Sequence, residues 1–312
     1  MWRKPALALA AAMLLMTSCG QGAADKEGAE IQTGGAGSAD DGAANETAQP
    51  EPDDGTDSVA DESGASTDDP AMSGEQSGAE EDEGSAGAPP APQYRMNGVY
   101  RFEPIDGAAE KKVVLLTFDD GPKDRTVLEQ MLDALDSHQA KAVFFVNGYR
   151  AVKQPELLEL IHERGHAIGN HSWDHIDLKK EQEEVVREQI GRVQRLVEET
   201  IGEAPKMFRP PFGSGGEYVK GIAEEFGLLF TTWSNGSLDW DASTKNKPDA
   251  VIENVLDQLH PGANILMHEL PWTAEALDEL LGKIEEEGYG FLDPALIEIP
   301  APSRTDGEGS EA

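Results

Sequence analysis

Seven carboxylate, guanidinium and imidazole side chains between residues 119 and 268 could carry out chemistry. They form five groups: Asp119 with Asp120, His171 with His175, Arg209, Asp239 and His268. Carboxylates and imidazoles transfer protons and bind catalytic metal ions. A single pair of histidines four residues apart also arises by chance on protein surfaces. These groups therefore indicate a metal or acid–base site only if the fold brings them together.

Short apolar runs precede most of these groups and predict strands. They lack clean alternation, as strands buried on both faces do. The expected strands are 113–118, 142–146, 166–169, 207–209, 228–233, 264–267 and 289–292. Helical patterns lie between them, so strand and helix alternate about seven times. This alternation predicts an α/β fold with a parallel sheet, open or closed into a barrel.

Three of the helical patterns have recognisable ends or faces. Pro155 suits the first turn of a helix that Gly165 follows. Apolar residues within 186–197 step by four, three and four positions, which places them on one helix face. Thr273 is the expected N-cap of a last helix, and Gly288 lies just beyond its end.

The reactive groups share one position relative to the expected strands. The Asp119-Asp120 pair follows the first strand, and His171 follows the third. Arg209 ends the fourth, Asp239 lies after the fifth, and His268 ends the sixth. The C-terminal ends of parallel strands meet on one face of a barrel or line one crevice of an open sheet. Groups spread over about 150 residues are therefore expected to meet.

Five segments around these groups occur in a fixed order. They are Thr117-Phe118-Asp119-Asp120-Gly121, His171-Ser172-Trp173-Asp174-His175, Arg209-Pro210-Pro211-Phe212-Gly213, Asp239-Trp240 and Leu266-Met267-His268. Together they resemble the polysaccharide deacetylase family with the NodB-homology domain, also called carbohydrate esterase family 4. The resemblance covers residues 110–295. It implies an α/β fold of the distorted (β/α)7-type barrel.

The resemblance implies a metal site made by Asp120, His171 and His175. One carboxylate oxygen and two imidazole nitrogens with an open fourth position suit a catalytic Zn2+. Another divalent transition ion such as Co2+ could use the same ligands.

The resemblance also implies the remaining roles. Asp119 would be the general base and His268 the general acid, with Arg209 and Asp239 holding them in place. The backbone N–H of Phe212 would stabilise the oxyanion. Trp240 and Leu266 would form the apolar wall around the acetyl methyl group.

The sequence departs from the family pattern at three positions. Gly236 stands where an additional aspartate is frequent, and Phe212 stands where tyrosine is frequent. Glu269 follows the acid histidine where aspartate is frequent. None of these changes removes a group with an assigned role, but Gly236 and Phe212 bear on substrate contacts.

The N-terminus has the features of an export signal. Arg3 and Lys4 precede an apolar run that is too short for an ordinary membrane-spanning helix. The run ends in Met16-Thr17-Ser18-Cys19-Gly20, which resembles a bacterial lipobox, although leucine is more usual where Met16 stands. Residues 1–18 are therefore expected to be a lipoprotein signal peptide and Cys19 to carry lipid. The alternative is an ordinary secretory signal with a chance cysteine.

The segment after the signal differs in composition from the rest of the chain. Residues 21–92 contain 19 acidic residues and one basic residue, a net charge of −18 out of −35 for the whole chain. With few large apolar side chains, residues 19–93 are expected to be a disordered tether that spans roughly 45 Å. Residues 94–302 are the expected folded domain, and 303–312 a disordered tail.

The charge excludes some partners. An acidic chain without a basic stripe argues against nucleic acid. The expected activity is metal-dependent removal of N-acetyl groups from N-acetylglucosamine-type units of a polysaccharide, with peptidoglycan favoured by export and anchoring. The alternatives are chitin-like, poly-N-acetylglucosamine or O-acetylated polymers, or a non-catalytic wall-binding lipoprotein. The remaining histidines are expected to be structural or superficial: His138, His162, His166 and His260.

Overall fold

The structure, a computed structural model, describes residues 90–301. The predictions made for residues 1–89 and 302–312 lie outside the described residues. These include the signal peptide, the lipidated Cys19, nearly all of the tether and the C-terminal tail.

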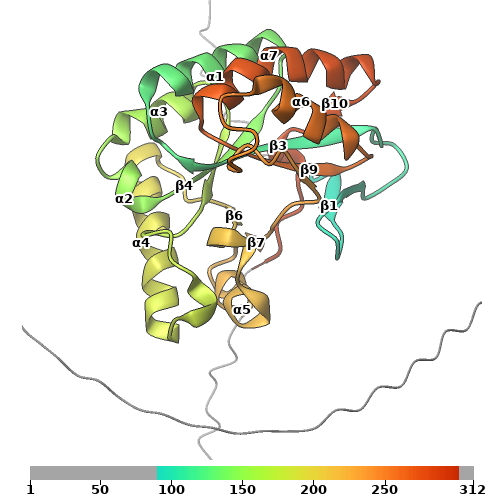
Figure 1. The fold of residues 1–312 in the computed structure, drawn as a ribbon. Helices are drawn as coiled ribbons and strands as arrows, with labels where there is room; N and C mark the ends of the chain where they lie inside the picture. Colours follow the sequence, from blue (N-terminus) through green and yellow to red (C-terminus); the bar gives the residue numbers. More distant parts are fainter. Residues whose placement is uncertain (1–89, 302–312) are drawn as a thin grey trace, which may run out of the picture. The chain divides into compact units, whose positions relative to one another are not determined.

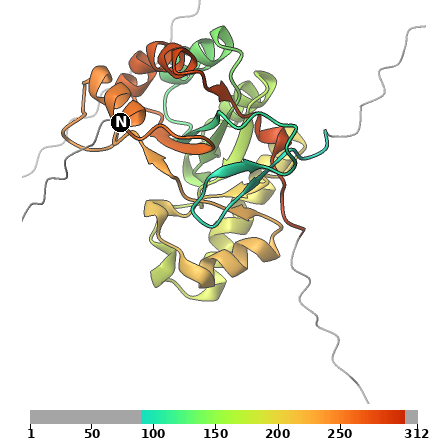
Figure 2. The ribbon, with the colours of Figure 1, turned by 90° about the vertical axis from the view of Figure 1, so that its right-hand side faces the viewer.

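Seven parallel strands curl into a barrel-like sheet with helices around its outside (Figures 1 and 2). They are β3 (Val113–Gly121), β4 (Ala142–Val146), β5 (Ala167–Asn170), β6 (Met207–Phe208), β7 (Leu229–Phe230), β8 (Asn235–Gly236) and β9 (Ala263–His268). Hydrogen-bonded neighbours follow the order β7-β6-β5-β4-β3-β9-β8. The two end strands are joined by residues 231–234 alone, and so short a connection keeps them close. The barrel prediction is confirmed, with an opening between β7 and β8.

Four strands differ from the sequence-based expectation. The run at 289–292 forms β10 (Gly290–Phe291), which pairs with the first residues of β3 instead of taking a place in the ring. The ring is completed by β8, whose Asn-Gly sequence has no strand pattern. An antiparallel hairpin of β1 (Tyr94–Met96) and β2 (Phe102–Pro104) was also not predicted.

Helices lie between the strands, and three of them form at the patterns noted at 155–165, 186–197 and 273–288. The helices are α1 (Arg125–Ser137), α2 (Gly148–Ala151), α3 (Pro155–Glu163), α4 (Glu183–Ile201), α5 (Gly216–Glu225), α6 (Pro248–Asp257) and α7 (Pro271–Glu286), with short 3₁₀ turns at Leu178–Lys180, Pro211–Gly213 and Pro294–Leu296. Helix α3 begins at Pro155, as expected. The N-cap prediction for Thr273 is wrong, because α7 begins at Pro271 and Thr273 lies inside its first turn.

Alternation along β3 separates two parts of the core. Val114, Leu116 and Phe118 pack under helices in the larger cluster, whereas Val113 and Leu115 belong to a second cluster with residues of β4 and β6. Successive side chains of a strand point to opposite faces. Thr117 and Asp119 therefore share the face of Val113 and Leu115, which is the interior of the ring.

A bulge at the end of β3 re-aims the second carboxylate. The pairing of β3 with β4 shifts register between Asp119 and Gly121, and Asp120 has a φ of 71°. Such bulges change the direction of a side chain beside a functional site. Both adjacent carboxylates can therefore serve the same site.

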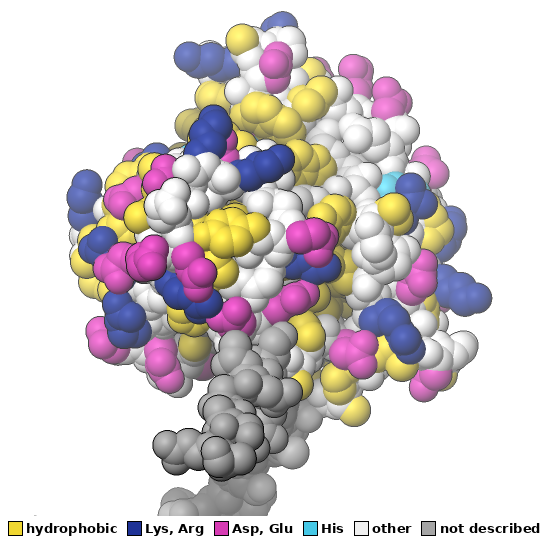
Figure 3. Space-filling model, turned by 90° about the horizontal axis from the view of Figure 1, so that it is seen from below, with side chains coloured by type: hydrophobic (Ala, Val, Ile, Leu, Met, Phe, Trp, Pro, Cys, Tyr) yellow, Lys and Arg dark blue, Asp and Glu magenta, His cyan; other side chains and the backbone are white. Residues whose placement is uncertain are grey.

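One face of the described domain is mixed in charge. On the face in Figure 3, acidic and basic side chains are interspersed, with hydrophobic side chains between them. Within residues 90–301, no helix is both long enough and apolar enough to span a bilayer.

Candidate active site

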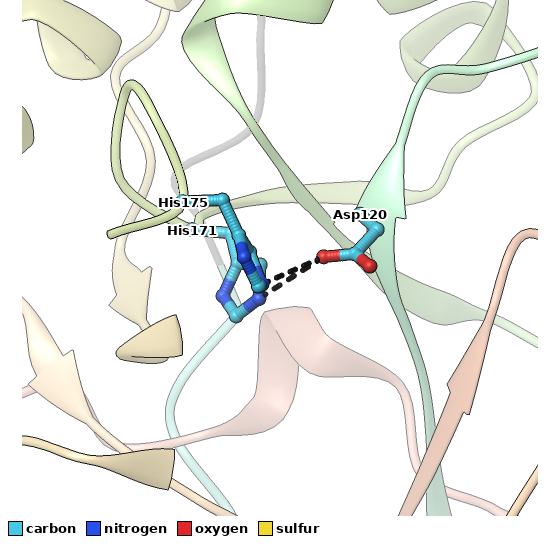
Figure 4. Close-up of side chains that lie close together, drawn as sticks. All are labelled: Asp120, His171 and His175. Carbon is cyan, nitrogen blue, oxygen red and sulfur yellow. Dashed lines mark ion pairs between the residues drawn. The ribbon is translucent and has the colours of Figure 1, made fainter. Parts of the chain in front are cut away.

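Asp120, His171 and His175 come together at the C-terminal ends of β3 and β5, as Figure 4 shows. The Oδ1 atom of Asp120 lies 3.4 Å from Nε2 of His171 and 3.1 Å from Nε2 of His175. One donor atom from each residue lies within 4.8 Å of the others. The two histidines reach the site from the loop after β5, not from a helix face.

The hydrogen bonds around this triad fit a bound cation. The Nδ1–H of His171 donates to the carbonyl oxygen of Arg209 (2.6 Å), because a carbonyl can only accept. The Nε2 atom of a neutral His171 is then an acceptor that faces Asp120 Oδ1. That oxygen is buried and accepts no hydrogen bond from the described residues. Acceptors that face one another without a hydrogen are stabilised by a metal ion between them.

Four residues at this site have left-handed backbone conformations that are uncommon outside glycine. They are Asp120, Ser172, His175 and Phe212, with φ between 55° and 71°. Each such conformation costs on the order of 1–3 kcal/mol and persists where the surrounding structure enforces it. Their concentration here agrees with a functional role for these loops.

The pKa of Asp120 is set by two opposed effects. Burial raises the pKa of this carboxyl group, but the hydrogen bonds and positive charge that the His171 and His175 imidazoles supply when protonated outweigh burial and hold it well below its usual range; a cation at the triad would supply that charge when the imidazoles are neutral. Asp120 is therefore ionised at neutral pH, which is the state that binds a cation.

Asp119 points into the barrel beside the triad. Its side chain is buried, and its Oδ1 accepts a hydrogen bond from Nη1 of Arg209 at 2.8 Å. Its Oδ2 lies 3.7 Å from Nε2 of His171. One carboxylate oxygen is thus held by a cation while the other faces the metal ligands.

Arg209 is fully buried directly after β6, and residues from several other segments hold it. Its Nη1 also donates to Thr117 Oγ1 (2.7 Å), and its Nη2 donates to the Thr232 carbonyl (2.8 Å) and to Asn264 Oδ1 (3.1 Å). The guanidinium lies 4.4 Å from the centre of the Phe145 ring. These contacts fix Asp119 through Arg209.

His268 ends β9 and forms a second buried ion pair. Its Nδ1 lies 2.7 Å from Oδ1 of Asp239, and its backbone N–H donates to Oδ2 of Asp239 at 2.6 Å. The same Oδ2 accepts from Thr273 Oγ1 (2.7 Å), and the Trp272 indole N–H donates to the Asp239 carbonyl (2.8 Å). Helix α7 therefore fixes Asp239 through its first turn.

The protonation of His268 is favoured by its surroundings. Burial lowers the pKa of His268, but the hydrogen bond to Asp239 and the negative charges of Asp239, Asp119 and Asp120 outweigh it and raise the pKa above the usual value. Asp119 and His268 are paired residues on the adjacent parallel strands β3 and β9. A negative carboxylate and an imidazole that favours its proton thus stand side by side.

Aromatic side chains line the rim. The ring of Phe212 lies 4.8 Å from that of His175 and is largely exposed. The ring of Trp240 lies 5.2 Å from that of His268 and is also exposed. Leu266 is buried in β9, two residues before His268. All the predicted site residues from Asp119 to His268 therefore lie near one end of the barrel.

The structure also explains one departure from the family pattern. Glu269 is buried, and its Oε1 accepts hydrogen bonds from the backbone N–H groups of Lys123 (2.6 Å) and Asp124 (2.8 Å). The longer side chain thus holds the loop that follows the Asp119-Asp120 pair.

Sequence reasoning missed the neutral residues that orient the charged ones. Thr117 could have been noted, because it begins the segment Thr117-Phe118-Asp119-Asp120-Gly121. Asn264 and Thr273 belong to no quoted segment, and nothing in the sequence connects them to Arg209 or Asp239.

Comparisons with known proteins agree with this geometry. The polysaccharide deacetylase family model matches residues 106–231. A peptidoglycan-N-acetylglucosamine deacetylase of Listeria monocytogenes is 38% identical over 60% of this chain and 39% of its own length. One of Bacillus cereus is 35% identical over 60% of this chain and 69% of its own length. The chain thus spans about two fifths of the length of the Listeria relatives.

Solved structures give the same family. A peptidoglycan N-acetylglucosamine deacetylase in complex with an N-hydroxybenzamide derivative is 34% identical, with a TM-score of 0.57 over 62% of this chain and 91% of that one. A Bacillus anthracis protein described as a carbohydrate esterase family 4 pseudoenzyme is 28% identical, with a TM-score of 0.57 over 62% and 68% of the two chains. The chain belongs to the polysaccharide deacetylase family, carbohydrate esterase family 4.

Proposed function

We propose that this protein hydrolyses N-acetyl groups of N-acetylglucosamine-type units in peptidoglycan. The observation that carries the proposal is the placement of two ion pairs, Asp119–Arg209 and Asp239–His268, beside one metal-ligand triad at the same end of the barrel. Amide hydrolysis needs an attacking water, stabilisation of an oxyanion and a proton for the leaving amine. The site offers a group for each requirement.

Asp120, His171 and His175 would hold the metal ion, with Zn2+ as the expected ion and Co2+ as an alternative. A bound divalent ion supplies positive charge that polarises the acetyl carbonyl and makes a water easier to deprotonate.

Asp119 is the proposed base. Its Oδ1 is occupied by Arg209, which leaves Oδ2 on the side of the metal ligands to accept a proton from water. The buried guanidinium of Arg209 holds this carboxylate in a fixed orientation through its hydrogen bond to Oδ1.

His268 is the proposed acid. Its Nδ1 is bound to Asp239, so Nε2 is the atom that donates a proton to the departing nitrogen. Asp239 orients the ring and favours its charged form. A positioned acid or base typically contributes 10²–10⁴-fold to a rate.

The acetyl group is proposed to lie between Phe212 and Trp240. The backbone N–H of Phe212 would donate to the oxyanion. The left-handed conformation at Phe212 supports this role, because it is a strained position at the site. Trp240 and Leu266 would contact the methyl group.

Peptidoglycan is proposed as the substrate because relatives that match this domain carry that activity in their names. We further propose that Cys19 anchors the protein to the outer face of the membrane and that residues 19–93 let the domain reach the wall. Chitin-like, poly-N-acetylglucosamine and O-acetylated polymers remain alternative substrates.

The proposal is tested by acetate release from the purified, zinc-loaded protein. Isolated peptidoglycan, N-acetylglucosamine oligomers and acetylated xylan are offered in parallel, with and without a chelator. Chelator-sensitive release from peptidoglycan that Asp119→Asn lowers by about 10²–10⁴-fold is expected. Full metal occupancy without release from any polymer would contradict catalysis and favour a non-catalytic wall-binding role.

A further inference from the structure

Lys123 is a cation beside the metal ligands to which the proposed mechanism gives no role. Its Nζ lies 3.8 Å from Oδ2 of Asp120, the oxygen turned away from the closest histidine contacts. That separation is longer than a direct charge-assisted hydrogen bond. The side chain is four-fifths buried, yet Nζ donates no hydrogen bond to any residue in the described range 90–301. Its donors are therefore available to a ligand.

Arg150, carried by α2, is a second cation without a role in the proposed mechanism. The loop and helix that carry it are fixed to the site, because Asn147 N–H donates to the Gly121 carbonyl (3.0 Å) and Gly148 N–H donates to the Ser172 carbonyl (3.2 Å). Among the described residues the guanidinium has no ion pair or hydrogen bond, and its Nε is buried without an acceptor. Its guanidinium carbon lies 4.9 Å from the centre of the Tyr149 ring.

The segment that follows α2 lies against the loop that carries Lys123, because Nε2 of Gln154 donates a hydrogen bond to the Lys123 carbonyl (3.4 Å). The electrostatic influence of Arg150 on Lys123 and on the buried Glu269 agrees with this placement. Glu269 does not neutralise them directly, because its Oε1 is used by backbone N–H groups and its Oε2 has no hydrogen-bond partner among the described residues. Like charges that are partly removed from water favour binding of an anion between them.

The charges of the side chains around this site also favour the binding of an anion. Four carboxylates face three permanent cations and His268: Asp119, Asp120, Asp239 and Glu269 against Lys123, Arg150 and Arg209. A divalent ion bound by the triad would add two positive charges, so the sum of these charges would be positive whether or not His268 is protonated. This local sign is opposite to the charge of −35 carried by the whole chain.

We propose that Lys123 and Arg150 form an anion subsite that binds a carboxylate of the glycan substrate next to the reacting acetyl group. The inference rests on the proposed function and sharpens it, because it selects N-acetylated glycans that carry carboxylates over neutral ones. The carboxylate is either on the reacting sugar, as in an N-acetylmuramic acid unit, or on the sugar beside it.

The test compares three glycans on the zinc-loaded full-length protein. They are peptide-free peptidoglycan strands, the same strands with their carboxylates reduced to alcohols, and N-acetylglucosamine oligomers. Binding is measured by calorimetry and turnover by acetate release. We expect reduction of the carboxylates to weaken binding about tenfold, the effect of losing one charge-assisted contact. Lys123→Gln and Arg150→Gln should each lose most of this difference through KM.

Lys153→Gln is the matched control, since Lys153 follows α2, is exposed and also lies near the Tyr149 ring, at 5.8 Å. It should keep the wild-type preference. Zinc content is measured for each variant, because Lys123 lies near a ligand. Identifying the deacetylated sugar by mass spectrometry shows which unit bears the recognised carboxylate.

Equal affinity of the wild type for native and reduced strands would overturn the subsite, even if acetate is released from both. Acetate release from no glycan would instead overturn the proposed function. The binding preference would still decide the subsite in that case.

Discussion

The two ends of strand β5 each carry a buried histidine in a different setting. His166 precedes the strand and His171 follows it, and both side chains are almost fully buried. The Nδ1 of His171 is bonded to the Arg209 carbonyl, and its Nε2 faces two carboxylates. Neither ring nitrogen of His166 has a hydrogen-bond partner among the described residues, and its ring packs edge-on against Phe144.

The comparison shows that burial alone does not identify a functional histidine. Burial lowers the pKa of His166 to about 4, with Lys141 adding to the effect, so His166 stays neutral in the folded protein. At His268 the same burial is outweighed by carboxylates, and the pKa rises. What differs at the C-terminal end of the barrel is the presence of charged partners.

The largest effect is expected at the functional end of β5. His171→Ala removes a metal ligand and a group that Arg209 supports, so bound zinc and acetate release should both fall at least about 10³-fold. Metal content is measured by atomic absorption and turnover by acetate release. Retention of stoichiometric zinc would show that His171 is not a ligand.

The next effect concerns the ion pair of the acid. Asp239→Asn removes the charge that raises the pKa of His268, and burial then lowers that pKa. Loss of the protonated acid should begin at lower pH, so the alkaline limit of kcat/KM should shift downward, with a decrease of about 10–10²-fold at neutral pH. A pH–rate profile with an unchanged alkaline limit would separate Asp239 from the acid.

A smaller effect is expected at the rim. Trp240 is nearly half exposed and carries none of the hydrogen bonds that hold Asp239, so Trp240→Ala should leave zinc binding and the melting temperature nearly unchanged. Loss of its contact with the acetyl group should lower kcat/KM about tenfold. A drop of more than 10³-fold would point to a role in positioning His268 instead.

The smallest effect on activity is expected at the other end of β5. His166→Leu removes no hydrogen bond seen among the described residues, so turnover should change less than about twofold. The pH dependence of the free energy of unfolding should change. In the wild type, the unfolded chain protonates His166 below about pH 6.5, while the folded protein does so only near pH 4.

The wild type therefore loses stability as pH falls through that interval, by up to about 3 kcal/mol from this group, and the variant should lose less. Denaturant unfolding at pH 7 and pH 4.5 measures the difference. An equal loss in both proteins would mean that His166 is protonated without penalty in the folded state.

Much of this site could be predicted from the sequence because its charged residues lie within short segments that follow apolar strands. The strands at β3, β4, β5 and β9 are signalled by continuous apolar runs, and α3 and α4 by helical periodicity. The same patterns gave no signal for β8, since two residues of Asn-Gly hold no periodicity. They predicted a strand at β10 but not its pairing with β3. Pairing between strands depends on residues far apart in the chain.

The sequence by itself determined which charged groups stand at the ends of which strands, because local apolar patterns fix strand ends. Only the tertiary structure decided how those groups are held. The partners of Arg209 come from positions up to 92 residues away, and Thr273 reaches Asp239 from the first turn of another helix. The tertiary structure also decided that Lys123 and Arg150 share one site, because hydrogen bonds between the loop before α2 and the end of β3 bring their segments together. Hydrogen bonds of this kind depend on distances of about 3 Å, which no spacing along a chain specifies.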